Sequence, residues 1–501
     1  MNFAIMSDNE KIYRSMILSD LFEGLNVELS KENGKLEISG ITVDSRTVQQ
    51  GNLFIAVPGH SQDGRQYISE ALSLGASIVL TIAGKDIIAG VPVILADDLT
   101  EILPIIANRF YDFPSEKIKI AGVTGTNGKT TTAYLIEAIF DSVGEKWGKI
   151  GTVGYDTGSR VIPAQNTTPG PVDIQKLLAE MVENDMDGCA MEVSSHALEQ
   201  GRSDGINFFS ATFTNLTQDH LDYHENMEKY FLAKARLFEN AARSIINIDD
   251  DYGRKLLRRI AGDIITYSFR READLECKAI SSDIDSSLLE FKYKDRLSRF
   301  RFPLPGIFNH LNAAAAAATA LSFGLSLNDI TNGLSQATTV PGRMQAVSFG
   351  QPFGVYVDYA HTPGALENLL KSIRSFEPDH IHVVFGCGGD RDVTKRPLMA
   401  MAVSKYADFV YLTSDNPRTE DPDKIIKDTL PGITDKKRCR VIEDRALAIK
   451  AAIASAKSGD IVVIAGKGHE EYQIVGAVKK YFSDIEAVKS ELRKLGYENN
   501  G

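Results

Sequence analysis

The 501-residue sequence has few cysteines and lacks any long apolar run. Four cysteines are too few to cross-link a secreted fold, and their spacing excludes a C-x-x-C metal or redox motif. They are Cys189, Cys277, Cys387 and Cys439. No stretch approaches the roughly 18 apolar residues that span a membrane, and the N-terminal region holds only one short apolar stretch, at 3–6. The sequence therefore predicts a cytoplasmic protein with reduced thiols and neither a signal peptide nor a membrane span.

Positive charge is also scarce, since 55 Lys and Arg residues stand against 67 Asp and Glu residues and give a net charge of −12. Such an acidic chain disfavours nonspecific binding to nucleic acid. Any anionic ligand must then be held by a local cluster of positive groups. The hydrophobic (43%) and charged (24%) fractions are those of an ordinary globular protein, and the length predicts about three domains.

A glycine-rich segment is the clearest motif. Residues 122–132 read G-V-T-G-T-N-G-K-T-T-T, between an apolar run at 118–121 and a helix-like segment at 133–140. A strand that leads through a glycine turn into a helix binds phosphate with its backbone N–H groups and the helix N-terminus. Lys129 would neutralise the phosphate and Thr130 would reach a magnesium ion. The segment predicts a nucleoside triphosphate site.

The spacing of this segment departs from the general motif, which requires glycine where this chain has Val123. The glycines fall instead at 122, 125 and 128. A tight structural connection between strand and helix is the alternative interpretation. The Lys-Thr-Thr sequence that follows directly favours the phosphate site.

Three blocks are expected along the chain, at 1–115, 116–340 and 341–501, and together they predict an α/β protein. The first block has apolar runs at 53–57 and 77–80 and a helical stretch near 67–74, which indicates a small α/β domain. The second block contains the glycine-rich segment and is expected to be a P-loop domain with a mostly parallel sheet. In this block the alanine run at 313–318 predicts a buried helix capped by Asn309 or Asn312.

The third block is expected to be a Rossmann-like, doubly wound domain. Strand-like runs alternate with helical patterns, and the spacing of Leu366, Leu369, Leu370 and Ile373 is that of an amphipathic helix. The expected strands lie at 355–357, 381–385, 409–412 and 461–464. Polar, glycine-rich loops follow them, at 358–361, 386–392, 414–418 and 466–470. Because ligands of open α/β sheets bind at the carboxyl ends of the strands, these loops predict a site.

The middle block holds further polar groups. Glu192 ends an apolar run and can ligate magnesium, while Ser194, Gln200 and Arg202 can donate to an anionic substrate. A serine nucleophile at 194–196 is an alternative, although the G-x-S-x-G elbow is absent. His220 and His224 could be zinc ligands on one helix face, but no H-E-x-x-H completes such a site, so a single histidine beside magnesium is favoured. Composition alone predicts that Lys234 is a solvated helix lysine.

The ordered set of motifs resembles the Mur ligases of peptidoglycan synthesis over essentially the whole chain, and among them the ligases that add meso-2,6-diaminopimelate. Members of the family use the glycine spacing found here. The matching motifs are G-T-N-G-K-T-T at 125–131, T-T-P at 167–169, E-V-S-S-H-A-L at 192–198, D-H-L-D-Y-H at 219–224, P-G-R-M at 341–344, D-Y-A-H-T-P at 358–363, G-C-G-G-D-R-D at 386–392 and D-N-P-R at 415–418.

This resemblance implies an amide ligase that uses ATP and Mg²⁺. It would phosphorylate the D-glutamate side-chain carboxylate of UDP-MurNAc-L-Ala-D-Glu, and the amine of meso-diaminopimelate would then displace phosphate through a tetrahedral intermediate. The three blocks would bind the UDP-sugar, ATP and the amino acid in turn. A monomer without nucleic-acid or membrane partners is expected.

The resemblance also implies roles for individual residues. Lys129, Glu192, His220 and Lys234 would be catalytic, with Thr130, Glu192, His220 and a carbamylated Lys234 (N6-carboxylysine) around magnesium. The ATP contacts would be Gly125, Thr126, Asn127, Gly128, Lys129, Thr130, Thr131, Asn309, Arg343 and Asp358. The UDP-MurNAc-dipeptide contacts would be Ser45, His60, Ser61, Gln62, Thr167, Thr168, Ser194, Gln200 and Arg202. The diaminopimelate contacts would be Arg391, Asp415, Asn416, Pro417, Arg418, Gly466 and Glu470.

The D-N-P-R sequence favours diaminopimelate over lysine, because an arginine fork can bind the additional carboxylate in a bidentate way. Acidic side chains would take the distal ammonium. A lysine-adding ligase of the same family is the nearest alternative. A folylpolyglutamate synthetase would share the P-loop but is not expected to carry D-N-P-R, and a noncatalytic nucleotide-binding switch would not need Lys129, Glu192, His220 and Lys234 together.

Overall fold

The computed structural model describes residues 15–58, 63–82, 91–283 and 286–498. The chain divides into two compact units, Met1–Gly122 with Lys146–Phe209, and Val123–Glu145 with Ser210–Gly501. Among the residues described, no helix is long and apolar enough to cross a membrane.

The first unit begins with a five-stranded sheet whose order is β2-β7-β6-β5-β4. Its strands are β2 (Val27–Glu28), β4 (Gly40–Thr42), β5 (Asn52–Ile55), β6 (Ile78–Ile82) and β7 (Val93–Ala96). Strands β4 to β7 are parallel and β2 is antiparallel. Strands β1 (Met16–Ile17) and β3 (Glu37–Ile38) form a separate pair. Strands β5 and β6 confirm the two apolar runs expected there.

Three helices accompany this sheet, α1 (Leu18–Leu21), α2 (Ile68–Ser73) and α3 (Leu99–Phe110). Helix α2 confirms the helical stretch expected near 67–74. Asp98 caps α3 by accepting from the Thr100 backbone N–H. Helix α3 packs against α5 (Pro171–Glu183), and Val172 and Ala179 of α5 belong to the same buried core as α3.

The rest of the first unit carries β9 (Trp147–Ile150), β10 (Tyr155–Asp156), β11 (Val161–Ile162), β12 (Gly188–Glu192) and α6 (Ser195–Glu199). Strand β12 runs parallel to β9, and β10 is antiparallel to both β9 and β11. Every residue of β12 is buried. Glu192, the last residue of β12, is therefore buried.

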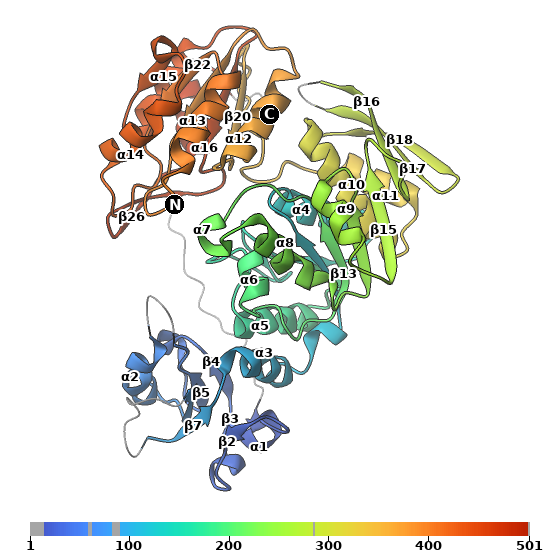
Figure 1. Ribbon diagram of the computed structural model, residues 1–501, viewed down its shortest axis with the longest axis vertical. Helices are drawn as coiled ribbons and strands as arrows, with labels where there is room; N and C mark the ends of the chain where they lie inside the picture. Colours follow the sequence, from blue (N-terminus) through green and yellow to red (C-terminus); the bar gives the residue numbers. More distant parts are fainter. Residues whose placement is uncertain (1–14, 59–62, 83–90, 284–285, 499–501) are drawn as a thin grey trace. The chain divides into compact units, whose positions relative to one another are not determined.

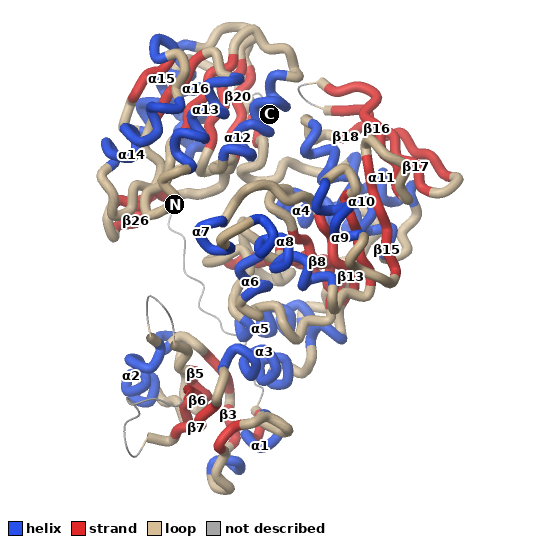
Figure 2. Tube along the Cα trace, viewed as in Figure 1, coloured by secondary structure: helices blue, strands red, loops and turns tan. Residues whose placement is uncertain are grey.

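Strands β8 (Lys119–Thr124) and β13 (Phe208–Phe213) each start in the first unit and end in the second. In the second unit, β13, β14 (Arg243–Asn247) and β15 (Asp263–Ser268) are parallel neighbours. An antiparallel ribbon of β16 (Leu275–Ser282), β17 (Ser287–Tyr293) and β18 (Arg296–Phe302) extends this sheet (Figure 2). The helices here are α4 (Lys129–Asp141), α7 (Leu221–His224), α8 (Met227–Ala235), α9 (Asp251–Leu257), α10 (Ile307–Ser322) and α11 (Leu327–Ser335).

Helix α10 contains the alanine run, and Ala313–Ala318 are fully buried, as expected. The expected asparagine cap is wrong. The helix starts before both asparagines, its N-cap is Gly306, and the Asn309 side chain instead donates to the Pro305 carbonyl at 2.8 Å. Small side chains let α10 lie close to α4, with which it makes an extensive contact.

The C-terminal sheet has the order β19-β20-β24-β21-β22-β23. The strands are β19 (Gln345–Ala346), β20 (Gly354–Asp358), β21 (Ile381–Phe385), β22 (Phe409–Leu412), β23 (Cys439–Val441) and β24 (Ile461–Ala465). All are parallel except β19. Its helices are α12 (Pro363–Arg374), α13 (Lys395–Tyr406), α14 (Pro422–Thr429), α15 (Arg445–Ser455) and α16 (Asp484–Lys494), and a hairpin is formed by β25 (Tyr472–Val475) and β26 (Val478–Tyr481) (Figure 1).

Two buried cores cover the two faces of this sheet. One core joins the sheet to α12, α13 and α14, and the other joins it to α15 and α16. The doubly wound arrangement, the four expected strands and the amphipathic helix at α12 are confirmed. The four loops that follow β20, β21, β22 and β24 consequently lie at one edge of the sheet.

Candidate functional site

The glycine-rich segment forms the turn between β8 and α4. Gly128, with φ of 89°, is the N-cap of α4, and Lys129 is its first residue. The Lys129 Nζ donates to the carbonyls of Gly125 at 2.9 Å and Thr126 at 3.0 Å. The arrangement places a lysine and the first N–H groups of a helix where a phosphate binds in such loops.

Neighbouring side chains require glycine at two positions of this turn. A Cβ on Gly125, which has φ of 152°, would lie 1.9 Å from Thr214 Oγ1, and a Cβ on Gly128 would lie 2.3 Å from Asn312 Oδ1. Both positions thus combine a backbone conformation that favours glycine with a close approach. The shape of the loop is fixed by Thr214 and Asn312, neither of which the sequence identified as part of a site.

Hydrogen bonds from the segment after β13 hold the middle of the loop. The Asn215 carbonyl accepts from the Thr126 N–H at 2.9 Å, and its side-chain oxygen accepts from the Asn127 N–H at 3.0 Å. The Thr217 N–H donates to Thr126 Oγ1, which lies 3.2 Å from the Tyr230 hydroxyl. These hydrogen bonds hold the loop against the segment after β13 and against Tyr230.

Lys234 lies beside this loop, and its predicted solvent exposure is wrong. The side chain is 1% exposed, and its Nζ donates to the Gly125 carbonyl at 2.8 Å, the same oxygen that Lys129 contacts. Burial and the charge of Lys129 hold the pKa of Lys234 well below its usual value, while Asp219 acts in the opposite direction. The neutral amine of Lys234 is therefore easier to reach than that of an exposed lysine.

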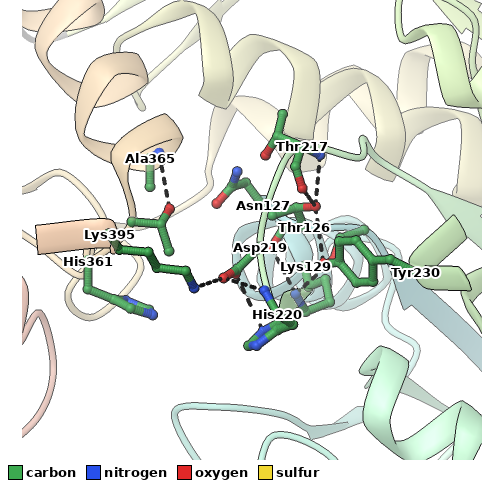
Figure 3. Close-up of polar contacts among 12 residues, drawn as sticks. Thr126, Asn127, Lys129, Thr217, Asp219, His220, Tyr230, His361, Ala365 and Lys395 are labelled. Atoms are coloured by element: carbon green, nitrogen blue, oxygen red, sulfur yellow. Dashed lines mark hydrogen bonds and ion pairs between the residues drawn. The ribbon is translucent and has the colours of Figure 1, made fainter. Parts of the chain in front are cut away.

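Asp219 connects His220 to the C-terminal part of the unit, as Figure 3 shows. Its carboxylate lies 3.4 Å from His220 Nε2 and accepts from Lys395 Nζ at 2.8 Å. Burial raises the pKa of Asp219, but the charges of His220, Lys395 and His361 outweigh it and bring the pKa to about 2. Lys395 begins α13, directly after the loop that carries Arg391, so this ion pair links the two loop systems.

The pair His220 and His224 does not form a shared helix face. His220 is the N-cap of the short helix α7, with φ of 51°, whereas His224 is buried and its ring stacks on Tyr230 at 5.0 Å. Across the described ranges, no three His, Cys, Asp or Glu side chains are grouped to hold a metal ion. His224 is therefore part of the packing around Tyr230.

Of the other residues expected at ATP, Thr130 and Thr131 lie buried in the first turn of α4. Arg343 reaches Thr130, donating from Nη2 to the hydroxyl at 3.0 Å, and stacks over the Tyr359 ring at 4.7 Å. Asp358 accepts from the N–H groups of Met344 and Ala360, each at 2.7 Å, and burial raises its pKa. Asn309 is buried on α10, in contact with the Pro305 carbonyl rather than with the loop.

In the first unit, the residues expected at the muramoyl-dipeptide form one cluster. The Thr168 hydroxyl donates to the Glu192 carbonyl at 2.9 Å and accepts from the Ser194 N–H at 3.0 Å. Arg202 donates to the Thr168 carbonyl at 3.0 Å and to Gln200 Oε1 at 2.9 Å. The turn after β12 thereby brings Thr168, Ser194, Gln200 and Arg202 together.

The Glu192 carboxylate lies in the same cluster. It accepts from the Thr152 backbone N–H at 2.9 Å and from the Thr152 hydroxyl at 3.1 Å, and Thr167 Oγ1 lies 3.0 Å from that hydroxyl. A Cβ on Gly151 would meet Glu192 Oε1 at 2.2 Å. The carboxylate is 2% exposed and fixed in orientation by its neighbours.

The expected uridine contacts are only partly described. Ser45 is buried, and its hydroxyl donates to Glu70 Oε2 at 2.8 Å. His60, Ser61 and Gln62 lie outside the described residues. Of the residues expected at magnesium, Glu192 belongs to the first unit, and Thr130, His220 and Lys234 belong to the second.

The residues expected at diaminopimelate come together at the edge of the C-terminal sheet. Asn416 donates to Glu470 Oε2 at 3.1 Å, and Arg418 donates to the Gly389 carbonyl at 2.7 Å. A Cβ on Gly388 would lie 3.0 Å from Arg418 Nη1 and 3.9 Å from Arg391 Cγ, so both arginines border this glycine. Burial and the charge of Arg391 lower the pKa of Arg418, while Asp415, Glu470 and Asp390 raise it.

Backbone geometry explains how these loops approach one another. The Gly389 N–H donates to the Asn416 carbonyl at 2.9 Å, and a Cβ on Gly389 would lie 1.9 Å from the Pro417 carbonyl oxygen. Gly466 has φ of 121°, and a Cβ there would lie 2.7 Å from Asp415 Oδ2. The glycines in the expected motifs therefore permit contact between the loops.

Sequence reasoning missed several charged residues around these sites. Asp219, Lys395 and Lys467 all lie within 3.5 Å of an oppositely charged group. Lys467 is buried between Asp415 and Glu470. Its position between two glycines in the 466–470 loop is the signal that could have identified it.

Comparisons with known proteins match this chain to a single family over most of its length. Three family models match it: "Mur ligase family, catalytic domain" at 37–111, "Mur ligase middle domain" at 123–320 and "Mur ligase, glutamate ligase domain" at 342–468. A UDP-N-acetylmuramoyl-L-alanyl-D-glutamate--2,6-diaminopimelate ligase 1 from Clostridium acetobutylicum is 39% identical and covers 96% of this chain and 100% of that protein. A similarly named ligase from Caldanaerobacter subterraneus is 41% identical over 95% of this chain and 99% of that protein.

Solved structures agree with this comparison. The structure of a UDP-N-acetylmuramoyl-L-alanyl-D-glutamate--2,6-diaminopimelate ligase matches with a TM-score of 0.67 and 32% identity, over 96% of this chain and 100% of that chain. A Mycobacterium tuberculosis folylpolyglutamate synthase has a TM-score of 0.59 and 18% identity, over 72% of this chain and 91% of that chain. The latter similarity concerns the fold alone.

Proposed function

Because the chain belongs to the Mur ligase family, we propose that it is an ATP-dependent amide ligase that adds meso-2,6-diaminopimelate to UDP-MurNAc-L-Ala-D-Glu. The bond would form between the D-glutamate side-chain carboxylate and an amine of diaminopimelate. The relatives that match over nearly their full length bear the name of this activity. The reaction would release ADP and phosphate.

The observation that carries the amino-acid assignment is the cluster at the edge of the C-terminal sheet. Arg418 and Arg391 border the same glycine, and Asp415, Asn416 and Glu470 lie on neighbouring loops. Two guanidinium groups fit a carboxylate, and carboxylates fit an ammonium. This is the set of groups that the distal end of diaminopimelate requires. Lysine lacks the distal carboxylate and would offer these guanidinium groups no carboxylate to bind.

The first chemical step would take place at the turn between β8 and α4. Lys129 would exchange its bonds to the Gly125 and Thr126 carbonyls for bonds to phosphate oxygens, and the α4 N–H groups would hold the transferred phosphate. The substrate carboxylate would attack the γ-phosphorus to give an acyl phosphate and ADP. Arg343, on the Thr130 hydroxyl, would lie near the nucleotide.

The donor chemistry of the expected metal residues fits magnesium, because the Thr130 hydroxyl and the Glu192 carboxylate are hard oxygen ligands. Thr152 fixes the Glu192 carboxylate with two hydrogen bonds. Bound magnesium would reduce the repulsion between phosphate oxygens and the attacking carboxylate. Asp219 would hold the His220 ring in place and keep a negative charge beside it.

We also propose that Lys234 is carbamylated. Its Nζ and that of Lys129 contact the same Gly125 carbonyl, which places two potential cations together in a buried setting. The lowered pKa of Lys234 makes the neutral amine easier to reach, and the nitrogen of that amine can attack carbon dioxide and release a proton. The resulting carbamate would place a negative charge next to Lys129.

In the second step the amine would attack the acyl carbon, and phosphate would leave the tetrahedral intermediate. Thr168, Ser194 and Arg202 would hold the acceptor peptide, and Ser45 with the 60–62 loop would contact uridine. We also propose domain boundaries at 115/116 and 340/341. The chain would act as a monomer in the cytoplasm, where ATP is available. Its net charge of −12 disfavours nucleic acid as a partner.

Phosphate release tests the proposed function. The chain is mixed with ATP, Mg²⁺ and UDP-MurNAc-L-Ala-D-Glu, and the rate is compared after adding meso-diaminopimelate, L-lysine or no amine. We expect turnover only when the acceptor and an amine are both present, and faster turnover with diaminopimelate. Equal or faster turnover with lysine would contradict the amino-acid assignment.

A further inference from the structure

Lys467 is a fully buried cation among the groups expected to bind the amino acid. Its side chain is 0% exposed, whereas lysines are ordinarily exposed. It follows β24 and lies between Gly466 and Gly468, both with positive φ. This backbone path directs the side chain into the domain.

The contacts of Lys467 are with residues of the proposed amino-acid site. Its Nζ lies 3.4 Å from Asp415 Oδ1, 3.5 Å from Glu470 Oε2 and 3.0 Å from Asn416 Oδ1. The same Nζ lies 5.7 Å from the centre of the Tyr472 ring. Lys467 thus joins the loop after β22 to the loop after β24.

The charges in this region balance. Three basic groups, Lys467, Arg391 and Arg418, stand against three acidic groups, Asp415, Glu470 and Asp390. A fourth basic group, Arg445, also acts on Asp415 and Glu470, but its charge is matched by its ion pair with Asp484. The distal end of diaminopimelate carries one ammonium and one carboxylate and is neutral overall. The distal end of lysine carries an ammonium alone. Without Lys467 the site would have an excess of negative charge and would attract lysine.

Resting on the function proposed above, we propose that Lys467 is a positioning and specificity-determining residue. Its buried charge offsets Asp415 and Glu470, so that the site favours an amino acid with a zwitterionic distal end over one with a lone ammonium. The contact with Asn416 also orients that side chain toward Glu470. Lys467 would thus disfavour the competing substrate, L-lysine, without contacting diaminopimelate.

The test measures kcat/KM for meso-diaminopimelate and for L-lysine in Lys467→Met, with Lys467→Arg as the charge-retaining variant. We expect the diaminopimelate-to-lysine ratio to fall roughly tenfold in Lys467→Met and to stay near the original value in Lys467→Arg. Lys479→Met is the matched control, because Lys479 lies over the same Tyr472 ring from an exposed position on β26. It should leave the ratio unchanged.

If Lys467 were purely structural, Lys467→Met would lower kcat/KM for meso-diaminopimelate and for L-lysine by the same factor. That result would overturn the inference. A second measurement avoids dependence on variant folding. In the unaltered chain, norleucine, which lacks any distal charge, should inhibit at least as well as lysine, and clearly stronger inhibition by lysine would also overturn it. An unaltered chain that turns over neither diaminopimelate nor lysine would instead reject the proposed function.

Discussion

At the scale of single residues, two buried lysines differ in the charges that surround them. Lys234 has a cationic neighbour, Lys129, and a lowered pKa, whereas Lys467 lies between two carboxylates. The interior penalises a charged group unless an opposite charge is close. Lys234 is therefore suited to chemistry as a neutral amine, and Lys467 is suited to act as a fixed charge.

Replacing Lys234 tests the proposed carbamate. Lys234→Ala should lower kcat by roughly a hundredfold because a charge near the phosphate is lost. Acetate, a small carboxylate, should restore part of the activity by occupying the space of the carbamate. Lys234→Arg, which retains a cation and cannot be carbamylated, should not respond to acetate. An alanine variant with unchanged kcat would contradict the role of Lys234.

The lowered pKa of Asp219 predicts a pH-dependent contribution to stability. The folded-state pKa is about 2 and the ordinary value is 3.8, so the contribution is fully present above pH 4 and is lost as the pH falls toward 2. Its size is about 2 kcal/mol. Calorimetry should show that Asp219→Asn unfolds at a lower temperature at pH 6 and that the difference shrinks on acidification.

Asp263→Asn is the control for this measurement, since Asp263 is an exposed acid that pairs with Arg243 on the same unit. Exposed ion pairs contribute little. A pH-independent difference between Asp219→Asn and the unaltered chain would show that the carboxylate charge is not the cause.

Arg418 should determine the use of diaminopimelate rather than of ATP. Arg418→Ala should raise KM for diaminopimelate by roughly ten- to a hundredfold, because a charged hydrogen bond is lost. KM for ATP should change little. Arg440→Ala, at an exposed position of β23, provides the comparison. Unchanged kinetics in Arg418→Ala would remove this arginine from the amino-acid site.

At the scale of elements, the turn between β8 and α4 depends on glycine for two separate reasons. Gly128 has a positive φ and also lies against Asn312, whereas Gly144, just beyond the end of α4, has φ of 85° and nothing within 4 Å of a Cβ. The two glycines therefore separate backbone strain from steric contact.

Gly128→Ala should abolish detectable ATP turnover, because the new Cβ would displace Asn312 and distort the phosphate loop. Gly144→Ala should keep its activity and lose roughly 1 kcal/mol of stability from the strained backbone. ATP affinity, measured by calorimetric titration, and turnover together distinguish the cases. Equal effects of the two substitutions would show that strain alone, and not the contact with Asn312, matters.

Elements with a strong periodic pattern could be predicted from the sequence. Helix α12 and strands β21 and β22 have the expected residues, because continuous apolar runs mark buried strands and i, i+3, i+4 spacing marks a helix face. The start of α10 could not be predicted, since Gly306, not an asparagine, precedes its first turn. Asparagine is favoured at the N-cap, but α10 begins at Ile307, so Asn309 and Asn312 both lie inside the helix.

At the scale of the whole molecule, the order of motifs predicted the family, while the contacts among the site residues needed the structure. The clustering of Thr168, Ser194 and Arg202 follows from the turn after β12, and no sequence spacing shows it. The ion pair between Asp219 and Lys395 joins positions 176 residues apart. Such pairs arise from tertiary packing and leave no local pattern.

The most direct measurement of the central claim follows oxygen transfer in a single reaction. UDP-MurNAc-L-Ala-D-Glu labelled with ¹⁸O in the glutamate side-chain carboxylate is incubated with the chain, Mg²⁺, ATP and meso-diaminopimelate. The account predicts that the released phosphate carries one ¹⁸O and that the mass of the product corresponds to the amide with diaminopimelate. Unlabelled phosphate, or no amide with diaminopimelate, would contradict it.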